Sequence, residues 1–153
     1  MQFTKTDLNK TLRVKKDYLE KNRTRYKVDA TGKTLGRLAV DIANKLIGKH
    51  KAGYNDFWDA GDFVVVENGD KLVVTGNKLT QKMYYRYSGY KGNVTSKSLQ
   101  EMMARTPERV LWFAVRWMLP KNKLRAHRMK RLKVVVGTTD KYDHFNPINL
   151  SND

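Results

Sequence analysis

An apolar stripe of helical period is the feature that most constrains how this chain folds. Between residues 35 and 47, apolar side chains recur at intervals of three and four, at Leu35, Leu38, Ala39, Ile42, Ala43, Leu46 and Ile47. This spacing places them on one side of an α-helix, which must be buried against other elements. The helix is predicted over 34–47, with Thr34 as its N-cap and Gly48 as the left-handed residue that ends it.

Strand patterns and further helices surround this segment. Short β-branched runs predict strands over 25–30, 62–67, 71–75 and 132–136. A turn signal at 68–70 separates the runs 62–67 and 71–75, which form either a hairpin or two separate strands of a sheet. Helices are expected around 99–103 and from Pro107, after the cap Thr106, to the break at Pro120. The alternation predicts an α/β fold, a single domain with a central, mainly parallel sheet flanked by helices.

The two ends of the chain differ from this middle part. Residues 1–24 carry few apolar side chains, and we interpret them as a basic N-terminal extension that becomes ordered mainly against a partner. Residues 25–137 are expected to form the α/β domain, and residues 138–153 a polar C-terminal tail. The N-terminus lacks the apolar segment of a secretory signal, and no apolar run approaches the roughly 18 residues of a membrane span.

Charge indicates the class of partner. The chain contains 31 Lys and Arg against 15 Asp and Glu, a net charge of +16. From Met118 to Lys133, seven of sixteen residues are Lys or Arg and none is acidic. Like charges held together repel, so this stretch favours a polyanion, and phosphate backbones bind basic proteins chiefly by counterion release. No membrane-surface helix and no DNA-reading helix, finger or zipper is recognisable, which favours a large folded RNA.

Four basic zones are candidates for this contact: the N-terminal arm, residues 48–51, the acid-free stretch 71–100, and residues 116–133. Within the third zone, tyrosines are interleaved with basic residues, at Tyr84, Tyr85, Arg86, Tyr87, Tyr90 and Lys91. These rings either stack on unpaired bases or alternate into the core as part of a strand. Lys33, at the start of the predicted helix, is a further candidate for a phosphate contact.

The sequence gives little support for a catalytic site or a metal site. The chain has no Cys, its three His form no i,i+4 pair, and the segment 32–34 lacks the earlier Gly that a P-loop requires. Asp56, Asp59 and Asp62 recur at a spacing of three but do not match a calcium-binding loop. We interpret them as turn-forming, capping and ion-pairing residues. No enzyme activity, metal, cofactor or small-molecule substrate is therefore predicted.

Six segments resemble one known family. VDATGKTLGRLA (28–39), GKHK (48–51), DFVVVEN (62–68), VTGNKLTQKMYYRYSGYKG (74–92), RTPERVLWFAVRWMLPKNKL (105–124) and LKVVVG (132–137) are similar, in that order, to segments of the large-subunit ribosomal protein L13 family, bacterial type. The resemblance implies a structural constituent of the cytoplasmic ribosome. Such a protein binds and organises large-subunit ribosomal RNA during assembly, beside neighbouring ribosomal proteins. A free-standing RNA-binding regulator or assembly factor is the alternative.

The resemblance also implies where RNA is contacted. By position in the motifs, the RNA-facing residues are Lys33, Arg37, Lys49, His50, Lys51, Lys78, Lys82, Tyr85, Ser88, Gly89 and Lys121, followed by the basic run Lys123, Arg125, Arg128, Lys130 and Arg131. The interleaved Tyr84, Arg86, Tyr90 and Lys91 complete the predicted RNA-binding set. The chain departs from the family at Tyr26, where Trp is usual, and at Asn122 and Arg125, in a loop that is often Gly-rich. Asp140 and Tyr142 replace a usual pair of His.

Overall fold

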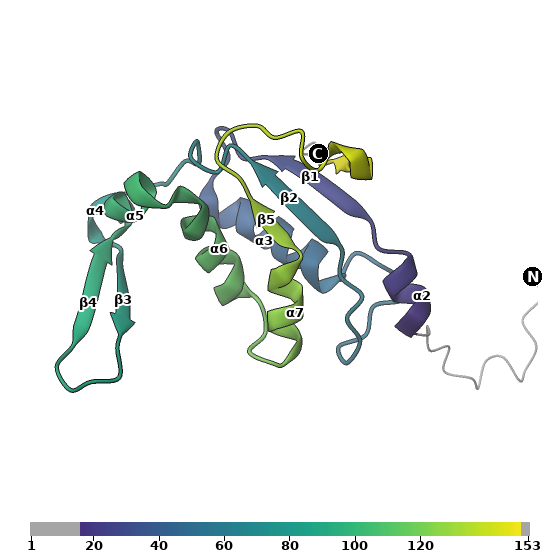
Figure 1. Ribbon diagram of the computed structural model, residues 1–153, viewed down its shortest axis with the longest axis horizontal. Helices are drawn as coiled ribbons and strands as arrows, with labels where there is room; N and C mark the ends of the chain where they lie inside the picture. Colours follow the sequence, from purple (N-terminus) through teal and green to yellow (C-terminus); the bar gives the residue numbers. More distant parts are fainter. Residues whose placement is uncertain (1–15, 151–153) are drawn as a thin grey trace, which may run out of the picture.

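A parallel sheet forms the centre of the protein. In the computed structural model, which describes residues 16–150, the strand order of this sheet is β5-β2-β1-β6 (Figure 1). The strands are β1 (Arg25–Asp29), β2 (Phe63–Glu67), β5 (Leu132–Val134) and β6 (Ile148–Asn149), and every neighbouring pair is parallel. The predicted α/β fold around a mainly parallel sheet is confirmed.

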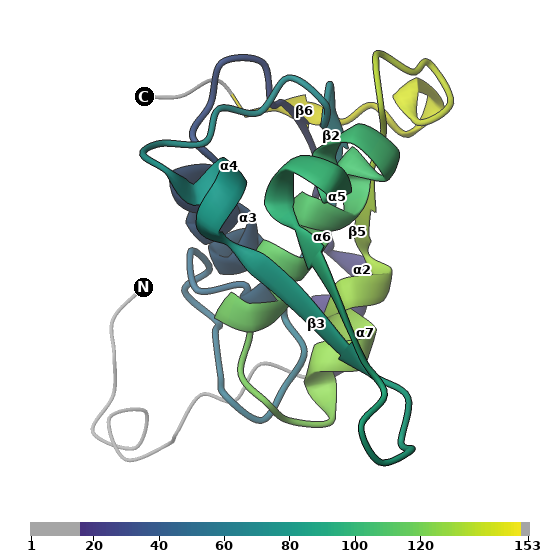
Figure 2. The same ribbon diagram turned by 90° about the vertical axis from the view of Figure 1, so that its left-hand side faces the viewer.

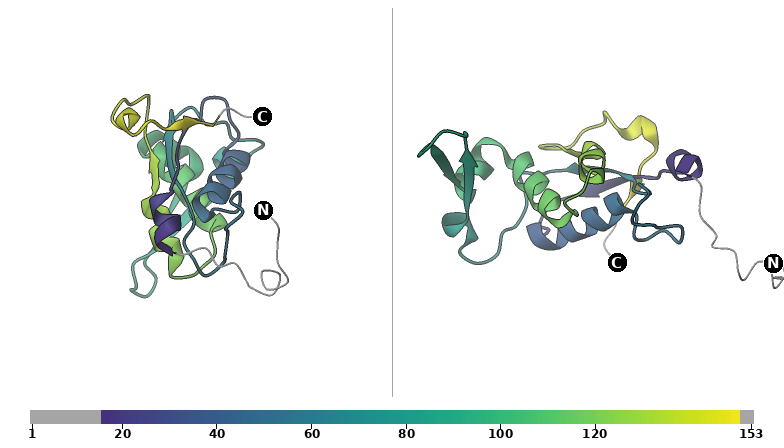
Figure 3. Two further views of the ribbon diagram at one scale, coloured as in Figure 1. Left: turned by 90° about the vertical axis from the view of Figure 1, so that its right-hand side faces the viewer. Right: turned by 90° about the horizontal axis from the view of Figure 1, so that it is seen from below.

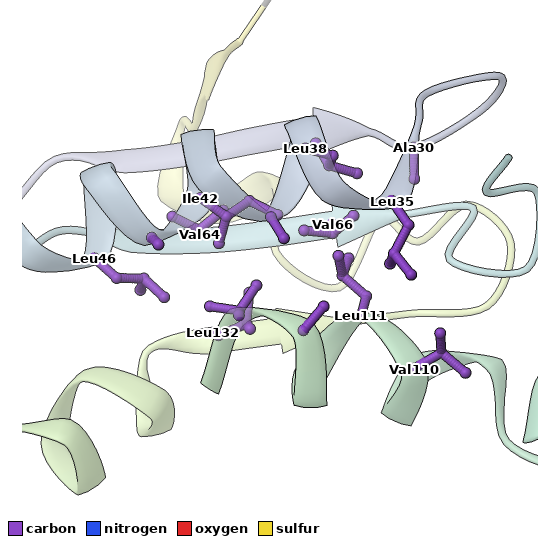
Figure 4. Close-up of a cluster of buried hydrophobic side chains, with 14 of the residues drawn as sticks. Ala30, Leu35, Leu38, Ile42, Leu46, Val64, Val66, Val110, Leu111 and Leu132 are labelled. Atoms are coloured by element: carbon purple, nitrogen blue, oxygen red, sulfur yellow. The ribbon is translucent and has the colours of Figure 1, made fainter. Parts of the chain in front are cut away.

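Two helices cover one face of this sheet. In the chain, α3 (Leu35–Ile47) connects β1 to β2, and α6 (Pro107–Met118) lies between β2 and β5. Both connections step the same way across the sheet, and parallel crossovers are right-handed, so both helices lie on the same face. They pack against each other, and Figure 4 shows Ile42 of α3 and Leu111 of α6 directed toward Val64 and Val66 of β2.

The predicted stripe of α3 is confirmed, because all seven of its apolar residues are buried. Gly48 ends the helix in the left-handed region, with φ of 88°. The start of the helix differs from the prediction: Thr34 occupies the N-cap position, but its side chain makes no capping hydrogen bond. The backbone N–H of Leu35 donates instead to the carbonyl of Val73 at 3.0 Å. A distant segment of backbone therefore satisfies the first orphan donor of α3.

That segment, 71–75, was predicted to be a strand, and this prediction is wrong. Its only ladder contact among the described residues is one isolated bridge between Val73 and Thr34. The chain turns after β2 as expected, where Lys71 N–H donates to Asn68 O at 2.9 Å, and then crosses the start of α3. Leu72 is buried in the core. Its β-branched neighbours meet helix and loop rather than a second strand, so no ladder extends.

An antiparallel hairpin projects from one end of the molecule (Figure 2). It consists of β3 (Met83–Tyr87) and β4 (Val94–Ser98), which pair only with each other. The short helices α4 (Lys78–Gln81) and α5 (Leu99–Arg105) precede and follow the hairpin. The tyrosine-rich stretch is therefore a strand, as one of the two interpretations expected, but only Tyr84 of β3 packs against the core, while Tyr85 and Tyr87 are exposed.

Helix α2 (Lys16–Lys21), at the start of the described residues, lies at the opposite end of the molecule from the hairpin (Figure 3). Much of the predicted extension, residues 1–15, lies outside the described residues. The rest begins with α2 (Lys16–Lys21), in which Leu19 is buried. Thr24 N–H donates to the Asp62 carboxylate at 2.8 Å. Residues 19–24 thus pack on the domain itself, whereas the expectation that the extension becomes ordered mainly against a partner stays a prediction for residues 1–15, which lie outside the described residues.

The tail and the basic run both contain more regular structure than predicted. The tail forms the 3-10 turn η1 (Asp143–Phe145) and adds β6 to the sheet beside β1. The residues after Pro120, expected to be a loop, form helix α7 (Leu124–Lys130). In the described part of the chain, no helix is both long and apolar enough to cross a bilayer.

Candidate nucleic-acid interface

Three connections point toward the same side of the molecule. They are the tip of the β3–β4 hairpin, the α6–α7 connection and the α3–β2 connection (Figures 1 and 2). They carry Lys91, Lys121 and Lys49 respectively, and all three side chains are exposed. Lys33 and Arg37 lie at the other end of α3, and a 13-residue helix spans roughly 20 Å. The structure thus brings parts of three predicted basic zones to one side and places the further candidates Lys33 and Arg37 at the other end of α3.

The hairpin carries free aromatic rings. Tyr85 is 73% exposed and Tyr90, at the tip, is 78% exposed. The basic residues of this motif and its turn residues are exposed too, at Arg86, Ser88, Gly89 and Lys91. Gly89 adopts φ of 97°, which favours glycine at this position of the turn. An exposed tyrosine ring beside cations can stack on an unpaired base.

Tyr84 differs from its neighbours, because its ring packs on α6. It is stacked against Trp117, with ring centroids 5.7 Å apart and planes 17° apart, and it also contacts Phe113. Lys82 Nζ lies 5.1 Å from the centroid of the Trp117 ring. Burial raises the pKa of the Tyr84 hydroxyl. Tyr84 therefore anchors the hairpin to the domain, and its placement in the RNA-binding set is not supported.

Two arginines of the predicted basic run are internal. Arg128 is 1% exposed and Arg131 is 4% exposed. The Arg131 guanidinium makes a two-pronged ion pair with Asp59, with Nη2 at 2.6 Å from Oδ1, and donates to the carbonyl of Leu46 at 3.2 Å. Arg128 Nε lies 3.7 Å from Asp59 Oδ1. The expectation that the whole run is exposed is wrong for these two residues.

Asp59 supplies the counter-charge for this cluster. Burial favours the neutral acid, but hydrogen bonds from Arg131 and the charges of Arg131, Arg23 and Arg128 outweigh it and lower the pKa of Asp59. The carboxylate therefore stays ionised and neutralises the buried guanidinium groups. The interpretation of Asp59 as an ion-pairing residue is confirmed.

A second internal cluster surrounds Asp62, whose side chain is fully buried. Lys51 pairs with this carboxylate and also donates to Ala60 O at 3.1 Å, while His50 Nε2 lies 3.0 Å from Asp62 Oδ2. Burial and the charge of Lys45 lower the pKa of His50, and the attraction of Asp62 offsets only part of this effect. His50 and Lys51 are thus bound within the fold, and Lys49 is the residue of the 49–51 group that presents a free surface cation.

Acidic residues end β1 and β2 at the carboxyl edge of the sheet, where α/β proteins usually bind ligands, and both accept hydrogen bonds from the protein itself. Asp29 accepts from the backbone N–H of Thr31 at 3.0 Å and from the Asn68 amide at 2.9 Å, and these bonds lower the pKa of Asp29 to about 2. Glu67 accepts from Thr139 N–H at 2.8 Å. Among the described residues, no group of three or more His, Cys, Asp or Glu is placed to hold a metal ion.

The remaining cations of the basic run face solvent. Lys121, Lys123 and Lys130 are exposed and Arg125 is half-buried. Trp112 was not a candidate in the sequence, and Arg116 and Lys133 lay in the fourth basic zone without being named as RNA-facing. All three line the same groove as Lys123, Arg125 and Lys130. Predicting a helix over residues 124–130 would have distinguished the basic residues that face the interior from those that face solvent.

These features define a class: a small, strongly basic α/β protein with a four-stranded parallel sheet, a projecting hairpin and surface cations concentrated on its connections. The sequence matches the family described as ribosomal protein L13 over residues 23–141. Proteins called large ribosomal subunit protein uL13, from Thermotoga petrophila and Thermotoga maritima, are each 50% identical to it over 127 residues, which are 83% of this chain and 84% of theirs. The chain belongs to the ribosomal protein L13 family.

Proposed function

We propose that this protein is a constituent of the large ribosomal subunit that binds and organises large-subunit ribosomal RNA during assembly. Family membership supports the place in the large subunit. The observation that carries RNA binding is the set of surface cations on three connections that share one side of the molecule (Figure 1). Phosphate backbones neutralise such cations, and folded RNA is recognised mainly by shape and backbone.

Within this proposal the predicted residues have three roles. The cations Lys49, Lys91, Lys121, Lys123 and Lys130 meet phosphates, and the exposed rings of Tyr85 and Tyr90 stack on unpaired bases. The internal residues Tyr84, Arg128 and Arg131, with His50 and Lys51, hold the connections in place. Lys33 and Arg37 form a separate contact at the start of α3. Further members of the RNA-contacting set are Lys78, Lys82, Arg86, Ser88, Gly89 and Arg125.

Binding to transcripts of large-subunit and small-subunit ribosomal RNA tests the proposal. The large-subunit transcript is expected to bind more tightly at every salt concentration, and its logarithmic affinity falls linearly with the logarithm of salt. Tyr85→Ala should weaken this binding, whereas Tyr18→Ala, on α2 and also largely exposed, serves as the matched control. Equal affinity for both transcripts would contradict the proposal.

Mass spectrometry of salt-washed subunits tests the place in the particle. A constituent is expected to remain on the large subunit at one copy per particle. Substoichiometric release at moderate salt would instead support a free-standing regulator or assembly factor.

A further inference from the structure

A basic groove runs between α6, α7 and the edge strand β5. It is lined by Trp112 and Arg116 of α6, Asn122 and Lys123 of the connection, Arg125, Ala126, Met129 and Lys130 of α7, and Leu132 and Lys133 of β5. Its volume of about 620 Å³ lies within the roughly 300–1,000 Å³ range of small-ligand sites. We propose that this groove holds one unpaired nucleotide of a single-stranded RNA segment, with its base against Trp112 and its phosphates on the surrounding cations.

The charge of the groove is the first argument. Five of its ten lining residues are Lys or Arg, and among the described residues that line it none is acidic. None of these five cations forms an ion pair with a carboxylate in the part of the chain that the structure describes. Arg128 and Arg131 come from the same stretch, yet both pair with Asp59 inside the fold. The fold thus neutralises the inward cations and leaves the groove cations for an external anion.

The aromatic wall is the second argument. Trp112 is half-buried, and the Arg116 guanidinium lies over its ring at 5.3 Å from the centroid. Phe113 meets the same ring edge-on, at 5.3 Å between centroids, which fixes its orientation. Trp112 also lines the neighbouring hollow toward Arg109 and Val134, so the ring stands between two recesses. Aromatic rings and Arg guanidinium planes are the surfaces on which unpaired bases stack.

The shape of the groove favours single-stranded RNA over two other polyanions, a nucleic-acid duplex and an acidic peptide. A base inside a duplex has both faces covered, so only an unpaired base can reach Trp112. An acidic peptide would most readily add to the edge of β5. That strand has three residues and an exposed Lys133, features that discourage strand addition. The inference rests on the proposed binding of ribosomal RNA and adds to it the class of RNA and the residues that hold it.

Fluorescence of a protein with Trp112 as its only tryptophan tests the inference. The full-length chain with Trp58→Phe and Trp117→Phe retains Trp112, and the matched control with Trp112→Phe and Trp117→Phe retains Trp58. The probes are a single-stranded RNA of ten nucleotides, the fully paired duplex of the same sequence, and a peptide of ten glutamates. We expect saturable quenching of Trp112 by the single strand, with little change from the duplex or the peptide, and no quenching of Trp58.

Substitutions give an independent measurement. Trp112→Ala should weaken binding of the single strand roughly 5- to 160-fold, the range found for loss of one stacked base. Lys130→Gln with Lys133→Gln, both exposed, should leave the melting temperature unchanged and flatten the salt slope by about 0.7 for each lost phosphate contact. Arg105→Gln with Lys141→Gln, both exposed and outside the groove and the four basic zones, is the charge-matched control and should leave the single-strand affinity unchanged.

The outcomes separate this inference from the proposed function. Tight binding of large-subunit ribosomal RNA with no response of Trp112 to the single strand would overturn the inference alone. Stronger quenching by oligo-glutamate than by RNA would also overturn it and point to a protein partner. Loss of preference for large-subunit ribosomal RNA would contradict the proposed function, whatever the groove binds.

Discussion

Removal of Asp59 should destabilise the protein far more than removal of an exposed carboxylate. Arg131 and Arg128 are almost fully buried, and Asp59 is the carboxylate that pairs with both. Asp59→Ala leaves these cations buried without a counter-charge, which costs about 3–5 kcal/mol of unfolding free energy, against roughly 0–1 kcal/mol for an exposed pair. For a domain of this size each kcal/mol lowers the melting temperature by about 2–4 °C, so a fall of about 6–20 °C is expected.

Urea denaturation and thermal melting measure this effect. Asp56→Ala is the matched control, because Asp56 lies three residues earlier and is exposed. Asp59→Ala combined with Arg131→Met should recover part of the loss, since the double variant no longer buries the Arg131 charge. An Asp59→Ala protein within about 1 kcal/mol of wild type would refute the reasoning, because it would show that water reaches these guanidinium groups.

The same pair makes stability depend on pH. The pKa of Asp59 is lower in the folded protein than in the unfolded chain, where it is about 3.9. Between these two pKa values the unfolded chain therefore binds more protons than the folded protein. The contribution of Asp59 is therefore complete above the unfolded pKa and is lost as the pH falls through the folded pKa. Wild type should lose stability on acidification more steeply than Asp59→Asn does.

Three further predictions concern the core, the hairpin and the basic surface. Ile42→Ala, in the buried stripe of α3, should cost about 2–5 kcal/mol in urea denaturation, because it leaves a cavity; unchanged stability would mean that the stripe does not face the core. Tyr84→Ala should speed hydrogen exchange and proteolysis across residues 83–98, whereas the exposed Tyr85→Ala should not; equal protection in both would contradict the anchoring role. Replacing Lys121, Lys123 and Lys130 with Gln should flatten the salt slope of ribosomal RNA binding by roughly 2–3 without changing the circular dichroism spectrum; an unchanged slope would exclude these lysines from the contact.

The main helices could be predicted because their signals are local. A period of 3.6 residues places Leu38 and Ile42 on one side of a helix whatever surrounds it, and Gly48 can end that helix through its own backbone freedom. The strand at 63–67 was equally recognisable from its β-branched residues. The similar β-branched composition at 71–75 gave a wrong strand prediction. A strand requires a neighbouring strand to pair with, and this segment meets the start of α3 instead.

The candidate site could be predicted only in part. Clustered charge indicated the kind of partner, since repulsion between like charges does not depend on the fold. Which tyrosines are free could not be read from the alternation, because Tyr84 and Tyr85 differ only in which face of the hairpin meets α6. The groove beside Trp112 was equally hidden, since α6, α7 and β5 form it together.

The sequence by itself determined the α/β class, the buried face of α3 and the excess of positive charge on which the expectation of a polyanion rests, because periodicity and net charge are properties of the chain. Tertiary structure alone decided which cations face outward. Arg131 lies 72 residues from Asp59 in the chain, and only the folded sheet and helices bring the two together. A buried cation is stable only beside such a partner, so the distinction between Arg131 and Lys130 depends on contacts that no local pattern contains.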